Sequence, residues 1–193
     1  MSPSFADDDD GSDRPGPNGV DKFSINPQGY SEFLLFEEVT EQSFDKVIAV
    51  NFKGAYFTIQ KALPLLRQGS SVIINASVGA RKGWPTTSTV STSKAAVVHL
   101  ARILSAELVD RGIRVNTLSP GPTDTAMFGR FPGDEQGDAV KGVLATNNPS
   151  KRIATPLEIA KLAVYLASDD SAYVVGADFL IDGGVTAISP VGA

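Results

Sequence analysis

The chain has 193 residues, of which 42% are hydrophobic and 20% charged, which suits one soluble domain with a buried core. It has no cysteine and one histidine, which excludes disulfides and thiolate or histidine metal clusters, so we expect no metal site. The formal net charge is −5, no apolar run could cross a bilayer and no secretory leader is evident. We therefore expect neither nucleic-acid nor membrane partners, and we expect a cytoplasmic location.

Residues 1–19 are rich in Asp, Gly, Pro and Ser, which predicts a disordered acidic tail. From residue 20 to residue 193 we expect one domain, in which short apolar runs alternate with stretches of helical period. The predicted strands are Val20–Asn26, Val72–Asn75, Ile113–Leu118 and Asp178–Ile181.

Three helices are predicted between these strands. The first covers Glu41–Leu66 with Thr40 as its cap, and the second covers Ser93–Asp110, where apolar residues form one stripe. The third begins after Thr155, because the sequence Thr-Pro-Leu-Glu has the pattern of a capping box. The glycine-rich stretch 127–152 is expected to be a lid or a partly helical insertion.

Strands that alternate with helices favour parallel pairing with right-handed crossovers. The sequence therefore predicts an α/β fold, with helices on both faces of a parallel sheet in a three-layer sandwich.

Three polar residues occur in the order and spacing of a known family: Asn51 in Val-Asn-Phe-Lys-Gly, Ser77 after a predicted strand, and Lys94 in Val-Ser-Thr-Ser-Lys. From about Val20 to Gly184 the chain resembles the classical short-chain dehydrogenases/reductases. The resemblance implies that Asn51 holds a water in a proton relay and that Ser77 binds the substrate oxygen. It implies that Lys94 binds the nicotinamide ribose and lowers the pKa of a tyrosine one helical turn earlier.

At that tyrosine position this sequence has Val90. Residues i and i+4 share one face of a helix, so the family's phenol and ammonium point into the same cleft. A positioned proton donor contributes about 10²–10⁴ in rate. The neighbouring hydroxyls of Ser88, Thr89, Ser91 and Thr92 are not expected to replace it, because alkyl hydroxyls are much weaker acids than phenols. Catalysis is therefore expected to be impaired.

Two later segments extend the resemblance. Pro120, Gly121, Thr123 and Thr125 match the family's Pro-Gly-x-x-x-Thr segment, which lies along the nicotinamide, although Pro and Gly also occur in plain turns. The two threonines would meet the carboxamide or a phosphate oxygen. The run Asp182-Gly183-Gly184 matches the family's closing segment.

The front of the domain, Val20 to Gly29, resembles the family's fourth strand, with Asn26 and Gly29 as counterparts of its Asn-Asn-Ala-Gly end. The resemblance thus implies an incomplete, N-terminally truncated Rossmann-type sandwich with family strands 4 to 7. The family's Gly-x-x-x-Gly-x-Gly turn, which binds the cofactor diphosphate at a helix N-terminus, is absent from the sequence.

The resemblance implies an oxidoreductase that uses NAD or NADP on a small secondary alcohol or ketone, impaired or inactive in this form. One alternative is a catalytically dead homologue that acts as an interaction subunit. It would form a homo-oligomer or pair with a complete family member through the two long helices. The other alternative is the product of a truncated or degenerate gene.

Overall fold

The computed structural model describes residues 22–25, 29–128 and 134–188. Its four strands are β1 (Lys22–Ile25), β2 (Ser71–Asn75), β3 (Arg114–Pro120) and β4 (Asp178–Ile181). They form one parallel sheet in the order β1-β2-β3-β4, with each strand hydrogen-bonded to the next. The predicted parallel α/β fold is confirmed.

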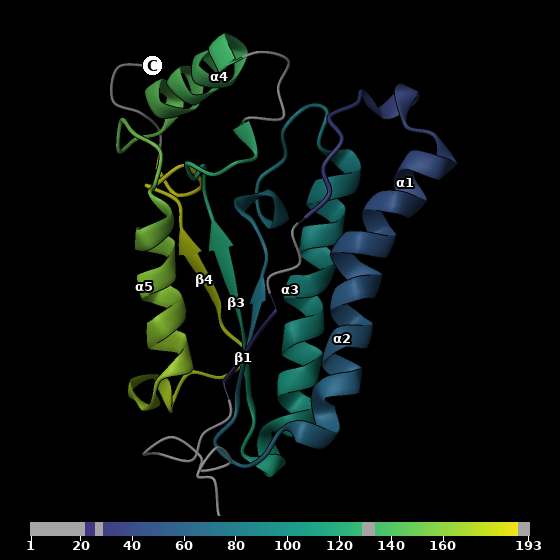
Figure 1. The fold of residues 1–193 in the computed structure, drawn as a ribbon, viewed down its shortest axis with the longest axis vertical. Helices are drawn as coiled ribbons and strands as arrows, with labels where there is room; N and C mark the ends of the chain where they lie inside the picture. Colours follow the sequence, from purple (N-terminus) through teal and green to yellow (C-terminus); the bar gives the residue numbers. More distant parts are fainter. Residues whose placement is uncertain (1–21, 26–28, 129–133, 189–193) are drawn as a thin grey trace, which may run out of the picture.

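Helices cover both faces of this sheet. On one face lie α1 (Glu41–Ile48), α2 (Gly54–Ala62) and α3 (Ser88–Leu108), and on the other lies α5 (Pro156–Ala167). The remaining helix, α4 (Asp134–Asn147), lies beyond the carboxyl ends of the strands (Figure 1). The stretch 127–152 is therefore partly helical, as predicted.

Two apolar clusters hold the layers together. Between the sheet and α2 and α3, the stripe predicted on α3 packs on the central strands, and Val72 and Val115 are fully buried. On the other face, Leu166 of α5 packs on Ile73 and Leu118. Alternate residues of β2 thus point to opposite apolar layers, which explains why Val72, Ile73 and Ile74 form a continuous apolar run.

The second helix begins five residues earlier than predicted, at Ser88 instead of Ser93. Serine and threonine usually favour turns, because their hydroxyls compete for backbone groups. Here the hydroxyls are satisfied within the helix, since Thr92 donates to the carbonyl oxygen of Ser88 at 2.7 Å. The helix ends at Leu108, two residues before the predicted end at Asp110, and a short 3₁₀ turn leads to the predicted terminator Gly112, which adopts a left-handed φ of 67°.

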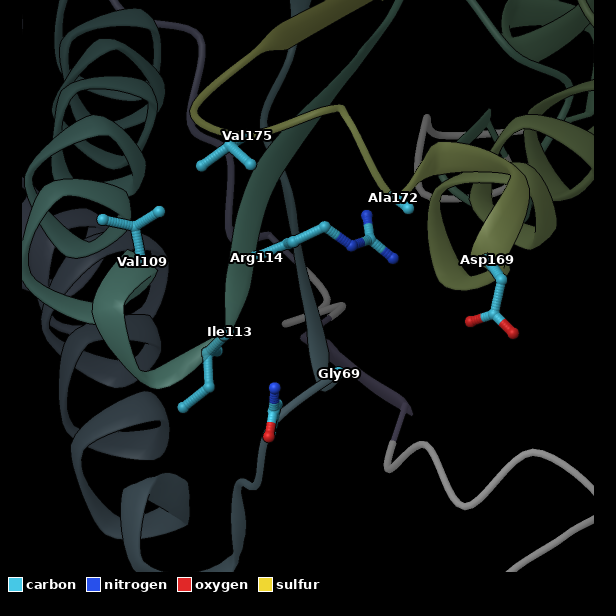
Figure 2. Close-up of a pocket in the computed structure, with 9 residues that line it drawn as sticks. Gly69, Val109, Ile113, Arg114, Asp169, Ala172 and Val175 are labelled. Atoms are coloured by element: carbon cyan, nitrogen blue, oxygen red, sulfur yellow. The ribbon is translucent and has the colours of Figure 1, made fainter.

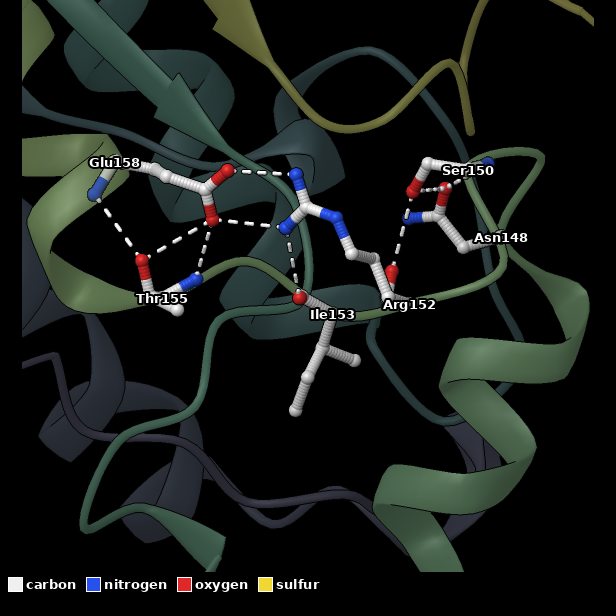
Figure 3. A network of polar contacts seen from close by, with 6 residues as sticks. All are labelled: Asn148, Ser150, Arg152, Ile153, Thr155 and Glu158. Carbon is white, nitrogen blue, oxygen red and sulfur yellow. Dashed lines mark hydrogen bonds and ion pairs between the residues drawn. The ribbon is translucent and has the colours of Figure 1, made fainter.

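The start of α5 is fixed by the predicted capping box. Thr155 accepts a hydrogen bond from the backbone N–H of Glu158, and Glu158 accepts one from the N–H of Thr155. Figure 3 shows that Arg152 also donates to both carboxylate oxygens of Glu158, at 2.8 and 2.6 Å. These hydrogen bonds, the one from Arg152 foremost, lower the pKa of Glu158 to about 2. The carboxylate therefore caps α5 at all ordinary pH values.

Just before α3, Thr86 has a φ of 67°, a left-handed conformation that is unfavourable for a β-branched residue. We expect Thr86→Gly to raise the free energy of unfolding by about 0.5–1 kcal/mol, because glycine relieves the strain but loses more chain entropy. Chemical denaturation measures this change. Thr86→Ala is the control and should gain less, since it keeps Cβ, and an equal gain would argue against backbone strain.

None of the helices in the described residues is long and apolar enough to cross a membrane. Within the same residues, no three His, Cys, Asp or Glu side chains gather where they could hold a metal ion. The predicted tail at residues 1–19 and the predicted cofactor residue Asn26 lie outside the described residues.

Candidate functional site

Asn51 lies in a turn of π-helix, Ala49–Lys53, that joins α1 to α2. The wider turn interrupts the helix predicted over Glu41–Leu66, and π-turns are frequent at functional sites. The side chain of Asn51 is 1% exposed. Its Oδ1 accepts from the backbone N–H of Tyr30 at 2.8 Å, and its Nδ2 donates to the carbonyl oxygen of Tyr30 at 2.9 Å. Asn51 therefore holds the segment that follows β1.

The same amide also contacts α3. Asn51 Nδ2 donates to Ser93 Oγ at 3.1 Å, and Ser93 Oγ donates to the carbonyl oxygen of Val90 at 2.6 Å. Ser93 is fully buried and was not among the predicted site residues, although it directly precedes Lys94. It couples the position of the asparagine to the first turns of α3.

Lys94 is 7% exposed and lies one residue beyond Ser93 on α3. Its Nζ donates to the backbone oxygen of Asn75, the last residue of β2, at 3.1 Å. A Cβ atom at Gly29 would lie 3.5 Å from Asn51 Oδ1 and 3.6 Å from Lys94 Nζ. The structure thus brings Gly29, Asn51 and Lys94 together at the carboxyl end of β2.

Burial lowers the pKa of Lys94 from 10.5 to about 8. The unfolded chain therefore binds more protons than the folded chain between about pH 8 and pH 10.5, and this group makes stability rise with pH across that window. At pH 7 the buried charge costs about 3 kcal/mol, of which the hydrogen bond to Asn75 returns about 1.

We therefore expect Lys94→Met to raise the free energy of unfolding by about 2 kcal/mol at pH 7. The difference from the parent protein should shrink above pH 8 and change sign before pH 10.5, where the charge is gone from both states and only the lost hydrogen bond to Asn75 remains. Urea denaturation of both proteins across this pH range measures it. The exposed substitution Lys61→Met is the control, and a gain independent of pH would contradict the burial of a charged amine.

Ser77 begins the 3₁₀ turn Val78–Ala80, two residues after β2. Its Oγ accepts a hydrogen bond from the N–H of Gly79 at 3.1 Å, while its own proton has no acceptor among the described residues. A Cβ atom at Gly79 would approach Ser91 Oγ to 2.8 Å, so this turn packs directly on the first turns of α3. Ser77 can therefore donate a hydrogen bond to a ligand oxygen at the same edge of the sheet.

Val90 precedes Lys94 by one turn of α3 and is half-buried. Because positions i and i+4 share a helix face, an apolar side chain stands beside the ammonium. Its isopropyl group has no proton to give.

Three of the hydroxyls near Val90, those of Thr87, Ser91 and Thr92, are engaged in local hydrogen bonds. Ser91 donates to Thr87 Oγ1 at 2.9 Å, and Thr87 donates to the carbonyl oxygen of Trp84 at 2.8 Å. Thr92 donates to the backbone of Ser88. These bonds stabilise the beginning of α3, and they leave the hydroxyls of Ser91, Thr87 and Thr92 committed to the protein.

The segment Pro120–Thr125 follows β3, at the same edge of the sheet. The N–H of Gly121 donates to Ile181 at 3.0 Å, and a Cβ atom at Gly121 would lie 2.7 Å from the Cα atom of Asp182. This glycine is therefore required by close packing against the end of β4. Thr123 donates to Gly121 at 2.9 Å, whereas Thr125 is exposed. No hydrogen bond in the described residues joins this segment to Asn51, Ser77 or Lys94.

A buried carboxylate, which the sequence did not single out, supports the turn that Ser77 begins. Asp178 begins β4 and its side chain is 1% exposed. It accepts hydrogen bonds from Thr117 at 2.8 Å, Ser119 at 2.6 Å and Arg81 at 2.7 Å. Arg81 directly follows the 3₁₀ turn that Ser77 begins, so this ion pair ties the turn to β4.

A pocket of about 350 Å³ lies at the opposite, amino-terminal edge of the sheet (Figure 2). Its buried Arg114 donates to carbonyl oxygens of Leu166 and Ser168 and to the hydroxyl of Ser171, at 2.9–3.3 Å. Burial lowers the pKa of this guanidinium, and the charge of Asp169 opposes that shift. Arg114 thus fastens the end of α5 to β3, and the pocket is separate from the edge where Lys94 lies.

A parallel α/β domain with Asn51, Ser77 and Lys94 at the carboxyl edge of its sheet is the arrangement expected of a nicotinamide-dependent oxidoreductase fold. Residues 22–186 match the family model described as enoyl-(acyl carrier protein) reductase. The chain belongs to the short-chain dehydrogenase/reductase family, whose members are NAD(P)-dependent oxidoreductases.

Two curated relatives and one solved structure illustrate the match. Dehydrogenase/reductase SDR family member 6 of Xenopus laevis is 39% identical over 174 residues, 86% of this chain and 70% of the relative. Oxidoreductase asL5 of Sarocladium schorii is 39% identical over 153 residues, 78% of this chain and 60% of the relative. The landomycin C-6 ketoreductase LanV, solved with NADP and rabelomycin, is 31% identical with a TM-score of 0.75, over 86% of this chain and 61% of that one.

The chain thus spans 60% and 70% of the length of these two curated relatives.

Proposed function

We propose that this chain is a dehydrogenase/reductase domain for a small secondary alcohol or ketone whose turnover is strongly impaired, because Val90 stands where the proton donor is needed. The observation that carries the proposal is the pairing of Val90 with Lys94 on one face of α3, with Ser77 beside them. The polar residues Asn51, Ser77 and Lys94 are retained, whereas the general acid at position 90 is not.

The retained residues have defined tasks in this proposal. Ser77 donates its free proton as a hydrogen bond to the substrate oxygen and orients the carbonyl. Asn51 fixes the segment after β1 through Tyr30, and Lys94 brings positive charge to the cleft. A bound nicotinamide would supply or accept the hydride at the substrate carbon. The alkoxide oxygen then has to gain a proton, and the side chain of Val90 cannot donate one.

The size of the defect follows from the missing acid. A positioned proton donor is worth about 10²–10⁴ in rate, which corresponds to roughly 3–5 kcal/mol of activation free energy. The hydroxyls of Ser91 and Thr92 donate to other groups of the protein, and their protons are far less acidic than that of a phenol. They do not close the gap.

Only one half of an NAD(P) site fits the residues present. Lys94 has a single acceptor, the carbonyl oxygen of Asn75, so its other N–H groups can bind ribose hydroxyls, and exposed Thr125 can reach the nicotinamide amide. The solved relative LanV holds NADP. The sequence has no Gly-x-x-x-Gly-x-Gly turn, so no comparable backbone site for the diphosphate is provided by the described residues.

Cofactor titration tests this division of the site. We expect the chain to bind reduced nicotinamide mononucleotide and NADPH with dissociation constants within about tenfold of each other, because a contact worth less than 1.4 kcal/mol changes affinity by less than tenfold. Nicotinamide fluorescence measures both, and Lys94→Ala should weaken both. Micromolar binding of NADPH that far exceeds binding of the mononucleotide would contradict the proposal.

A second candidate function, an interaction subunit, is favoured by apolar side chains on the outer helices. Phe44, Phe57 and Ile103 are 45%, 46% and 45% exposed on α1, α2 and α3. Monomeric proteins rarely expose contiguous apolar patches of more than a few hundred Å². We propose that these helices pair with a second copy or with a complete family member.

Light scattering coupled to size-exclusion chromatography tests the pairing. We expect a mass above that of the monomer, and Phe57→Asp should shift the protein toward the monomer, because an interface that buries a new carboxylate is strongly weakened. The exposed Tyr173→Asp, far along the chain from these helices, is the control. A parent protein that is monomeric and unfolds cooperatively would contradict the second candidate.

A further inference from the structure

Among the side chains that the structure describes, Lys94 is the buried lysine, and its surroundings are neutral. Its Nζ contacts the backbone oxygen of Asn75 and lies close to Gly29. No carboxylate among the described residues forms an ion pair with it. An ammonium ion in such a place lacks both bulk water and a counter-charge, so these surroundings shift the protonation equilibrium toward the neutral amine, compared with a lysine in water.

The titration of Lys94 agrees with this geometry. Burial is the cause that lowers its pKa to about 8. The exposed Lys46 and the half-buried Lys141 behave in the opposite way, because hydrogen bonds to Tyr30 and to Asp124 raise their pKa values. At neutral pH Lys94 therefore carries a far larger fraction of free amine than these two surface lysines do.

The surroundings of Lys94 reach solvent even though the amine itself is buried. Gly29, Asn75, Ser77 and Val90 are all half-buried rather than buried. The side chain at Val90 neither donates to nor accepts from the amine, so it does not compete with a small ligand for the nitrogen. Ser77, two residues beyond the Asn75 carbonyl that holds Nζ, has a proton available for a ligand oxygen.

We propose that Lys94 is a nucleophilic lysine that condenses with small aldehydes or ketones to form an imine. The lone pair of neutral Nζ attacks the carbonyl carbon, and Ser77 donates a hydrogen bond to the carbonyl oxygen. The two protons of the amine leave with that oxygen as water, and a C=N bond replaces the C=O bond. No oxidant, reductant or cofactor takes part, so this chemistry is independent of hydride transfer.

Reductive trapping tests the proposal on the intact chain. The protein is incubated with acetaldehyde, or with acetone as a ketone, and sodium cyanoborohydride at pH 7, and the alkylated lysines are located by mass spectrometry of peptides. We expect Lys94 to be alkylated at least tenfold faster than Lys46 or Lys141. Its rate should level off above about pH 8, while the rates of the surface lysines continue to rise.

Three controls make the result decisive. In denaturant Lys94 should react no faster than the other lysines, because its advantage comes from the fold. The chain's α-amino group has a similar basicity, with a pKa of about 8, and serves as an exposed reference. Ser77→Ala should slow alkylation of Lys94 without moving its pH midpoint. Alkylation of native Lys94 no faster than that of Lys46 and Lys141 would overturn the proposal.

Discussion

Replacing Val90 with tyrosine is expected to raise the rate of ketone reduction by about 10²–10⁴, the usual contribution of a positioned general acid. The phenol would stand one helical turn before Lys94, on the same face of α3. A neighbouring ammonium stabilises the phenolate and so lowers the pKa of the tyrosine toward neutrality. Because Val90 is half-buried, the larger ring can be accommodated toward solvent.

The rate should be measured with reduced nicotinamide mononucleotide at high concentration, since this cofactor does not need the adenosine half of the site. Val90→Phe is the matched control, because it adds the same ring without the hydroxyl and should leave the rate unchanged. An equal gain in the phenylalanine variant would assign the effect to packing. No gain in the tyrosine variant, with the mononucleotide bound, would show that the missing acid is not what limits turnover.

Replacing Asn51 with leucine is expected to lower the free energy of unfolding by about 3 kcal/mol, because two buried backbone groups lose their partners. The amide of Asn51 satisfies both the N–H and the carbonyl oxygen of Tyr30. Leucine has nearly the same shape but can do neither, and the side chain is too deeply buried for water to replace it easily. Equilibrium denaturation in urea measures the change.

The control for this variant is Ser93→Ala, which removes the hydrogen bond that Ser93 accepts from Asn51 and the one that it donates to Val90. It should cost about 2 kcal/mol, at about 1 kcal/mol net for each such bond. Amide hydrogen exchange should show faster exchange at Tyr30 in the leucine variant and little change there in the alanine variant. A leucine variant as stable as the parent would contradict the role assigned to Asn51.

Most of the fold could be predicted because its signals are local. The four apolar runs became four parallel strands, and the caps at Thr40 and Thr155 and the terminator Gly112 behave as their residue types indicate. The errors arose where a residue's local preference differs from its use in the fold. Ser88–Thr92 resembles a loop in sequence, but the hydroxyl of Thr92 donates to the carbonyl oxygen of Ser88 within α3. The predicted helix over Glu41–Leu66 contains a π-turn that no composition reveals.

The candidate site residues stay predictions. Asn51, Ser77 and Lys94 were chosen because their order and spacing resemble those of the family, and the structure places them at one edge of the sheet. Their partners were missed because these contacts join positions that are far apart in the sequence. Tyr30 and Ser93 lie 21 and 42 positions from Asn51, and Arg81 lies 97 positions from Asp178. Sequence spacing carries little information about such contacts, whereas the packing of α3 on β2 determines them.

We propose that this chain keeps the polar residues of a dehydrogenase/reductase site but that, among its described residues, no side chain beside Lys94 can donate the proton. The most direct test is the initial rate of ketone reduction by the unaltered chain with NADPH, NADH and reduced nicotinamide mononucleotide over a panel of small ketones. We predict rates indistinguishable from those without protein. Turnover by the unaltered chain that disappears in Lys94→Ala would contradict the account.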